Sequence, residues 1–271
     1  MDLRREAEAK LLKKESVAPT LHPRAREVLS GDFRERKTQH FTVRHKNVEI
    51  GEEVAAAAEK SYAEIFKALQ CATQIKNPVQ VLIYPTKEEY VAASGLQSWS
   101  GGAHQIARKM GDLSDHRIYS FQDQPRLTTG VLPHEIAHAL LQHRLNYPDK
   151  IPLWANEGFA VLREPEYFHR YYRRILSQNL AQKTLYPFKD ILSSPEYPKE
   201  RVELFYAQCF STVEFLVSEE GLDNFVNFLK SLSRPGADFD SNLQRYYKMV
   251  SALALENRWI AWFERRGEKN G

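Results

Sequence analysis

The chain has 271 residues, of which 42% are hydrophobic and 27% are charged, a balance typical of a globular protein with a substantial core. No apolar run approaches the roughly 18 residues that a transmembrane helix needs, so we expect no membrane span. The net charge of +3 is too small and too dispersed to indicate nucleic acid as the main partner. The two cysteines, Cys71 and Cys209, could form at most one disulfide, and we expect both to be buried thiols.

Residues 1–38 are rich in both basic and acidic side chains, which is the composition of a solvated helix or linker. Two functional alternatives are an inhibitory pro-segment and the tail of an upstream helical module. The segment lacks the apolar centre of a secretory signal and carries too many acids for a transit peptide. We therefore expect a cytoplasmic protein, or an exported one if the natural N-terminus lies upstream of Met1.

From residue 39 onward, the pattern predicts alternating strands and helices. The expected elements are a strand at 39–45, a helix at 49–70, a strand at 79–85, a short helix from 87 that Thr86 caps and Gly95 ends, and extended segments at 102–107 and 116–121. Together they indicate a mixed α/β lobe with a small sheet of about four strands.

After residue 157 the apolar spacing is helical to the end of the chain. Helices are expected at 165–176, 188–192, 202–220 with a stop at Gly221, 222–232, 239–249 and 251–266. The basic, tyrosine-rich helix at 165–176 could contact an acidic partner, but tyrosine stems beneath exposed arginines explain it as well. We therefore predict an α+β protein in which residues 39–271 form one catalytic domain, with an α/β lobe at 39–145 and a helical lobe at 146–271.

The main candidate catalytic and metal-binding residues lie in the sequence HEIAH, which begins at His134. Residues four apart share one face of a helix, so His134 and His138 can bind one metal ion while Glu135 reaches the space beside it as a general base. A catalytic zinc needs a third protein ligand. Glu157, which eighteen residues separate from His138, can supply it from a second helix whose first turn suits Pro152. Two imidazoles and a carboxylate favour one Zn²⁺ per chain, near the junction of the lobes.

Residues around this motif test the interpretation. Pro133 is tolerated only in the first turn of a helix, so the metal-binding helix should begin near residues 128–130 or kink at the proline. Leu141 and Arg144 stand where a metzincin would have glycine and histidine, which excludes that branch of the zincins. His143 lies more than a full turn beyond His138 and off the ligand face, so we expect it not to bind the metal.

The HExxH motif, the eighteen-residue gap and the run Asn156-Glu157-Gly158-Phe159-Ala160 resemble the gluzincin branch of zinc metallopeptidases, and the preceding PLW resembles its bacterial peptidase MA-like domains. The similarity is densest over residues 130–162. It implies a zincin-like fold, a zinc ion and hydrolysis of peptide bonds. It also implies that a residue on a later helix donates a hydrogen bond to the oxyanion, and Tyr206 stands at the matching position. Packing within an apolar helix is the other interpretation of Tyr206.

The resemblance further implies that an edge strand above the cleft binds the main chain of the substrate, which indicates Gly102, Ala103 and His104 as substrate-binding residues. A plain turn before a strand explains Gly101 and Gly102 equally well, and a solvent-facing histidine on an edge strand is the simpler interpretation of His104. Asn156 either orients a zinc-binding histidine from outside the ligand set or caps a turn.

The expected substrate class depends on a motif of gluzincin aminopeptidases that this chain lacks. Aminopeptidases with this glutamate element resemble one another also in a Gly-x-Met-Glu-Asn strand, whose glutamate captures the free amine of the substrate. This chain has GGAHQ at 101–105 and no such glutamate. We therefore expect internal bonds of peptides or proteins to be cleaved by metal-activated water with Glu135 as general base. A gluzincin aminopeptidase is one alternative. A zinc-stabilised binding module without catalysis is another, against which the intact HExxH argues.

Overall fold

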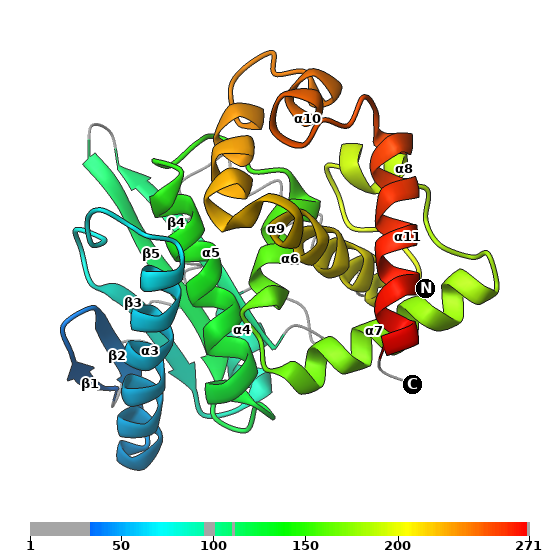
Figure 1. Cartoon of the computed structure of the whole chain (residues 1–271). Helices are drawn as coiled ribbons and strands as arrows, with labels where there is room; N and C mark the ends of the chain where they lie inside the picture. The colour runs from blue at the N-terminus through cyan, green and yellow to red at the C-terminus, as the bar shows by residue number, and fades with distance from the viewer. Residues whose placement is uncertain (1–32, 95–100, 110–111, 270–271) are drawn as a thin grey trace. The chain divides into compact units, whose positions relative to one another are not determined.

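The computed structural model describes residues 33–94, 101–109 and 112–269 (Figure 1). The chain divides into two compact units. The first contains the described residues up to Lys67, Cys71–Leu140 and Arg163–Pro165, and the second contains Ala68–Gln70, Leu141–Leu162 and the described residues from Glu166 onward. None of the helices in the described ranges is both long and apolar enough to cross a membrane.

The first unit is built on a five-stranded sheet with the order β1-β2-β3-β5-β4. Its strands are β1 (Arg34–Lys37), β2 (Phe41–His45), β3 (Val79–Tyr84), β4 (Gly102–Lys109) and β5 (Asp112–Phe121). Strands β2, β3 and β5 are parallel, whereas β1 and β4 pair antiparallel at the two edges. The sheet is therefore mixed, as we predicted.

Strand β1 is the element that the sequence did not reveal. All four of its side chains are exposed and charged, because they belong to a short edge strand that pairs only with β2 among the described residues. Such a strand lacks the apolar alternation from which strands are predicted, and its charges discourage pairing with a second chain. The predicted charged segment 1–38 thus ends in a strand, while its residues up to 32 lie outside the described part of the chain.

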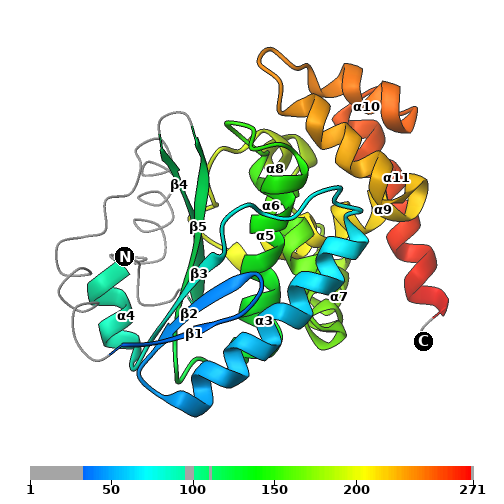
Figure 2. The same ribbon diagram turned by 90° about the vertical axis from the view of Figure 1, so that its left-hand side faces the viewer.

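Helices cover both faces of the sheet. Figure 2 shows α3 (Val48–Ala68) and α5 (Leu132–Arg144) on one face and α4 (Lys87–Ser94) on the other. Strand β3 is consequently buried along almost its whole length, as expected for a parallel strand covered on both sides. The predicted cap of α4 is confirmed, since Thr86 Oγ1 accepts a hydrogen bond from the Glu89 N–H at 3.2 Å. Gly95, predicted to end this helix, lies outside the described residues.

The entry into α5 explains Pro133. A π-helical turn, η1 (Leu127–Val131), runs directly into α5, and the N–H groups of Gly130 and Val131 both donate to the Arg126 carbonyl. Pro133 is then the second residue of α5 and directly follows the π-helical turn. The prediction of a helical start near residues 128–130 is confirmed, with the difference that the first turn is π-helical. Such turns are frequent at functional sites.

Helices are the only regular elements among the described residues of the second unit. Its helices are α6 (Leu153–Leu162), α7 (Glu166–Ala181), α8 (Phe188–Ser193), α9 (Val202–Leu232), α10 (Phe239–Tyr247) and α11 (Ala252–Lys269). Gly221 has φ 82° and ψ 166° and interrupts α9, which confirms the predicted stop. Helix α6 is buried nearly all round, and the fully buried Trp154 and Phe159 lie on it.

The two cysteines are free thiols. Cys209 lies in the core on α9, as predicted, but Cys71 is half-buried, so the prediction that both are buried is wrong for Cys71. Cys71 lies three residues after the end of α3, in the connection to β3.

Candidate metal centre

Three side chains from α5 and α6 form the core of the candidate site. Ligand atoms of His134, His138 and Glu157 all lie within 4.8 Å of one another. His138 and Glu157 are buried, with exposed fractions of 8% and 4%, and Glu135 beside them is 7% exposed. The predicted proximity is therefore confirmed. Two imidazoles and one carboxylate at this spacing fit a divalent ion of the zinc type, for which three protein ligands are characteristic of a catalytic site.

His134 is held by an acid that we did not predict. Its Nδ1 lies 2.7 Å from Oε1 of Glu164, which follows the end of α6. Because Nδ1 is engaged, the Nε2 atom is the one left to face an ion. Among the described residues, the buried Oδ1 of Asn156 has no hydrogen-bond partner, so the orienting role of Asn156 stays a prediction.

Glu157 is also held by a residue that we did not predict. The Tyr197 hydroxyl donates a hydrogen bond to Oε1 of Glu157 at 2.9 Å from the segment between α8 and α9. Tyr206, the predicted oxyanion donor, lies beside it, with 5.8 Å between the two ring centroids. The structure therefore places Tyr206 next to a tyrosine that contacts the candidate ligand.

Cys209 is a second group that Glu157 affects. Burial raises the pKa of the Cys209 thiol well above its usual range, and the Glu157 carboxylate raises it further.

The start of β4 lies against the candidate base. A side chain on Gly102 would place its Cβ 3.3 Å from Glu135 Oε1 and 2.4 Å from Val131 Cγ1. The absence of a side chain thus allows the strand to approach α5 closely. The neighbouring Ala103 is 7% exposed and packs in the apolar cluster between the sheet and α4. Only the main chain of Ala103 could therefore contact a substrate.

His104 is turned toward the site. Its Nε2 lies 2.8 Å from His116 Nδ1, and its ring stacks with that of His138 at a centroid distance of 6.3 Å. Burial, followed by the neighbouring His116 and His138, lowers the pKa of His104 well below its usual range. This arrangement does not support the solvent-facing interpretation of His104, because it places the imidazole beside a candidate ligand.

The last histidine of α5 lies outside the cluster. His143 Nδ1 is 3.1 Å from the Tyr147 hydroxyl, and His143 is not among the three residues that converge. This outcome confirms that His143 lies off the ligand face, and it makes His143 a useful control for the two histidines that face the site.

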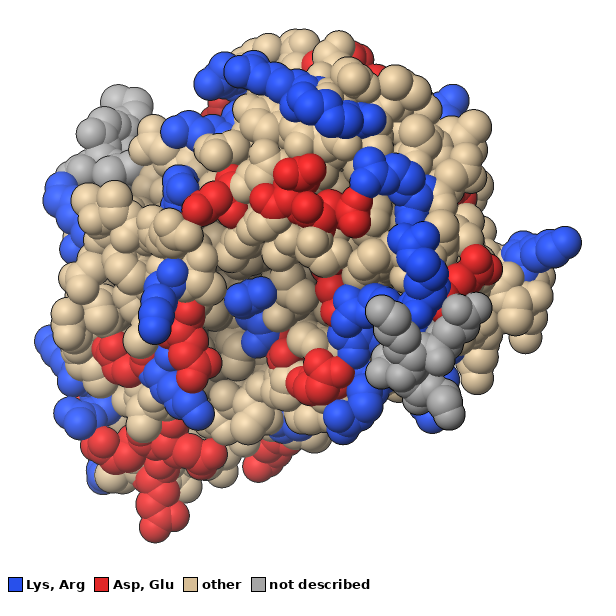
Figure 3. Space-filling model, viewed as in Figure 1, with Lys and Arg blue, Asp and Glu red and all other residues tan. Residues whose placement is uncertain are grey.

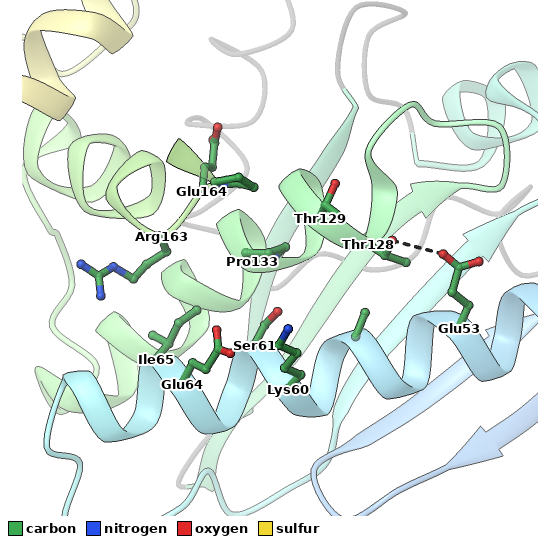
Figure 4. A pocket seen from close by; sticks show the side chains of 12 residues that line it. Glu53, Lys60, Ser61, Glu64, Ile65, Thr128, Thr129, Pro133, Arg163 and Glu164 are labelled. Atoms are coloured by element: carbon green, nitrogen blue, oxygen red, sulfur yellow. Dashed lines mark hydrogen bonds between the residues drawn. The ribbon is translucent and has the colours of Figure 1, made fainter. Parts of the chain in front are cut away.

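A pocket of about 480 Å³ lies in the first unit between α3 and the start of α5 (Figure 4). One wall carries Lys60, Ser61 and Glu64 from α3, and another carries Pro133 and Glu164. The remaining lining residues are Glu53, Ala57, Ile65, Thr128, Thr129, Arg163 and Pro165. The pocket therefore borders Glu164, the residue whose carboxylate holds His134.

The face in Figure 3 carries Lys and Arg side chains along its top and right-hand side, with Asp and Glu side chains between them. The expectation that nucleic acid is not the main partner stays a prediction.

A sequence model of the peptidase MA superfamily matches residues 57–265, which include both the HEIAH motif and Glu157. No curated protein matches the chain in sequence.

Proposed function

The chain belongs to the peptidase MA superfamily, and on this basis we propose that it is a zinc-dependent endopeptidase of the gluzincin type. The superfamily supports a metal-dependent peptidase that acts on peptides or proteins. The observation that carries the proposal is the convergence of His134, His138 and Glu157, with the buried Glu135 on the same helix. The choice of zinc rests on the donor set of two imidazoles and a carboxylate.

The proposed chemistry divides between the metal and the protein. A zinc ion held by the three ligands would polarise the scissile carbonyl and lower the pKa of a water molecule. Glu135 would accept the proton of the attacking water and deliver it to the leaving amine. Tyr206 would donate a hydrogen bond to the carbonyl oxygen as negative charge develops there.

The proposed substrate position is along β4. Among the described residues β4 is the last strand of the sheet, next to β5, and an edge strand is the kind of element that an extended peptide can pair with. Gly102 brings this strand next to Glu135. Internal cleavage is proposed because no carboxylate occupies 101–105 to bind a free amino terminus.

The first experiment separates metal binding from turnover. Metal content and hydrolysis of a peptide library are measured for the wild-type protein, Glu135→Gln, His138→Ala and His143→Ala. We expect Glu135→Gln to keep zinc and lose hydrolysis, because the amide cannot accept the proton. His138→Ala should lose both, whereas His143→Ala, on the same helix, should keep both. Retained hydrolysis in Glu135→Gln would refute the proposed base.

The second experiment compares peptides with free and blocked amino termini. An endopeptidase cleaves both, at internal bonds, whereas an aminopeptidase releases single residues from the free peptides alone. Absence of cleavage of every peptide by zinc-loaded protein would favour the non-catalytic binding module instead.

The third experiment distinguishes the two neighbouring tyrosines. Tyr206→Phe should lower kcat by about 10²–10³-fold with zinc affinity unchanged, which is the usual effect of losing an oxyanion donor. Tyr197→Phe should instead weaken zinc binding, since it removes the hydrogen bond to Glu157. An effect of Tyr206→Phe on zinc affinity alone would contradict the donor role.

A further inference from the structure

We infer that Glu164 is a positioning residue that holds His134 in the ring orientation and tautomer needed for metal binding. This inference rests on the proposed metal site. The Glu164 carboxylate accepts from Nδ1 of His134 at 2.7 Å, which leaves Nε2 as the atom that faces the ion. A carboxylate on the far nitrogen also makes the imidazole a stronger metal ligand.

The surroundings of Glu164 favour this role over that of a chance surface pair. The side chains of His134 and Glu164 are only 16% and 9% exposed. A carboxylate so shielded from water requires a hydrogen-bonding partner, and a hydrogen bond in such surroundings is stronger than one in water.

Two other histidine–glutamate pairs provide a comparison. The glutamate of the His40–Glu59 pair is 28% exposed, and that of the His169–Glu166 pair is 58% exposed. The carboxylate next to the candidate ligand is therefore the most shielded of the three. Neither His40 nor His169 belongs to the group that can hold a metal.

The chain also restricts where Glu164 can point. Glu164 directly precedes Pro165, and a residue before proline is largely confined to extended backbone conformations. It follows the end of α6 at Leu162 by two residues. The backbone thus limits the conformations of Glu164 before any metal binds, as a positioning role requires.

The pocket beside Glu164 makes a direct test possible. Glu164 lines this pocket of about 480 Å³ opposite the α3 side chains (Figure 4). Glu164→Ala removes the carboxylate and leaves space beside Nδ1 of His134. A small carboxylate such as formate could then reach Nδ1 of His134 and replace the missing group.

The experiment measures zinc affinity by competition with a chromophoric chelator, and thermal unfolding of the metal-free proteins. We expect Glu164→Ala to bind zinc about 10–100-fold more weakly than the wild type. Glu164→Gln should lie in between, because its amide oxygen still accepts the hydrogen bond but carries no charge. The matched control is Glu53→Ala, which removes another pocket carboxylate that accepts a hydrogen bond from Thr128 rather than from a histidine.

Recovery of zinc affinity in Glu164→Ala with formate, but not with chloride, would support the inference, provided that formate leaves the wild type unchanged. Equal affinity of Glu164→Ala and the wild type would overturn it, as would an equal loss in Glu53→Ala. If Glu164→Ala does not fold, the comparison of Glu164→Gln with the wild type decides in the same way. A wild-type protein that binds no zinc would refute the proposed function itself, whereas equal binding by wild type and variant would refute this inference alone.

Discussion

Replacing Gly158 with alanine tests how α6 holds Glu157 in place. An ideal Cβ at this position would lie 2.4 Å from the carbonyl oxygen of Cys209, 2.7 Å from its carbonyl carbon and 2.6 Å from Val213 Cγ2. Ordinary contacts of a Cβ begin at 3.4 Å, so α6 and α9 would have to separate by about 1 Å. The obstacle is largely backbone, which cannot rotate away as a side chain can.

The sign of the effect separates two explanations. Alanine is a better helix former than glycine, so propensity alone predicts a gain of about 0.5–1 kcal/mol in the free energy of unfolding. Overpacking costs about 1–3 kcal/mol. We expect overpacking to prevail, with a net loss of about 1–2 kcal/mol and a fall in Tm of about 2–8 °C, taking 2–4 °C for each kcal/mol. Zinc affinity should also fall, because Glu157 is the adjacent residue.

Denaturant unfolding and zinc competition measure both quantities. The matched control is Gly51→Ala on α3, where the Cβ would meet the ring of His45 at 2.3 Å, which is a side chain rather than backbone. We expect the control to lose less stability and to keep its zinc affinity. A Gly158→Ala protein as stable as the wild type, with equal zinc affinity, would show that the close approach of α6 to α9 does not constrain Glu157.

Three further predictions follow from burial, charge and metal binding. A thiol reagent should label Cys71 in the folded protein and Cys209 only after unfolding, because burial raises the pKa of the Cys209 thiol and the residue is inaccessible; equal labelling rates would contradict this. Burial by itself raises the pKa of Glu59, but hydrogen bonds, foremost from His40, outweigh it and leave the pKa below the usual 4.5. The stabilisation is therefore present above pH 4.5 and is lost as the pH falls through the folded-state pKa, so that denaturation curves of Glu59→Gln and the wild type should differ at pH 7 and converge in acid. Removing zinc with a chelator should reduce the free energy of unfolding by about 2.7 kcal/mol relative to protein held at 100 times its Kd in free zinc, and calorimetry that shows no change would contradict a site formed only in the folded state.

Elements with a clear apolar period were predicted from the sequence. Helix α3 and strand β3 lie within a few residues of their predicted ranges, and the stop at Gly221 is where we expected it. Each depends on local features, namely apolar periodicity or a glycine at positive φ. Strand β1 could not be predicted in this way, because its strand character depends on pairing with β2 rather than on its own charged residues.

In the metal site, too, some features follow from local sequence and others depend on tertiary structure. Backbone hydrogen bonds determine the geometry of a helix, so residues four apart face one ion in almost any fold, and His134 and His138 could be paired from their spacing alone. Glu157 could be identified as the third ligand only from its position on a predicted second helix and from the resemblance to gluzincins. The proximity of the three side chains became visible only in the folded chain.

Glu164 and Tyr197 could not be identified from any pattern, since each lies in a connection between helices with no periodicity of its own. Their contacts with His134 and Glu157 depend on where those connections lie in space, which packing of distant segments decides. Local backbone geometry thus accounts for the paired histidines and the base on one helix. The groups that orient the ligands are set by tertiary packing, because side-chain contacts across tens of residues have no counterpart in local spacing.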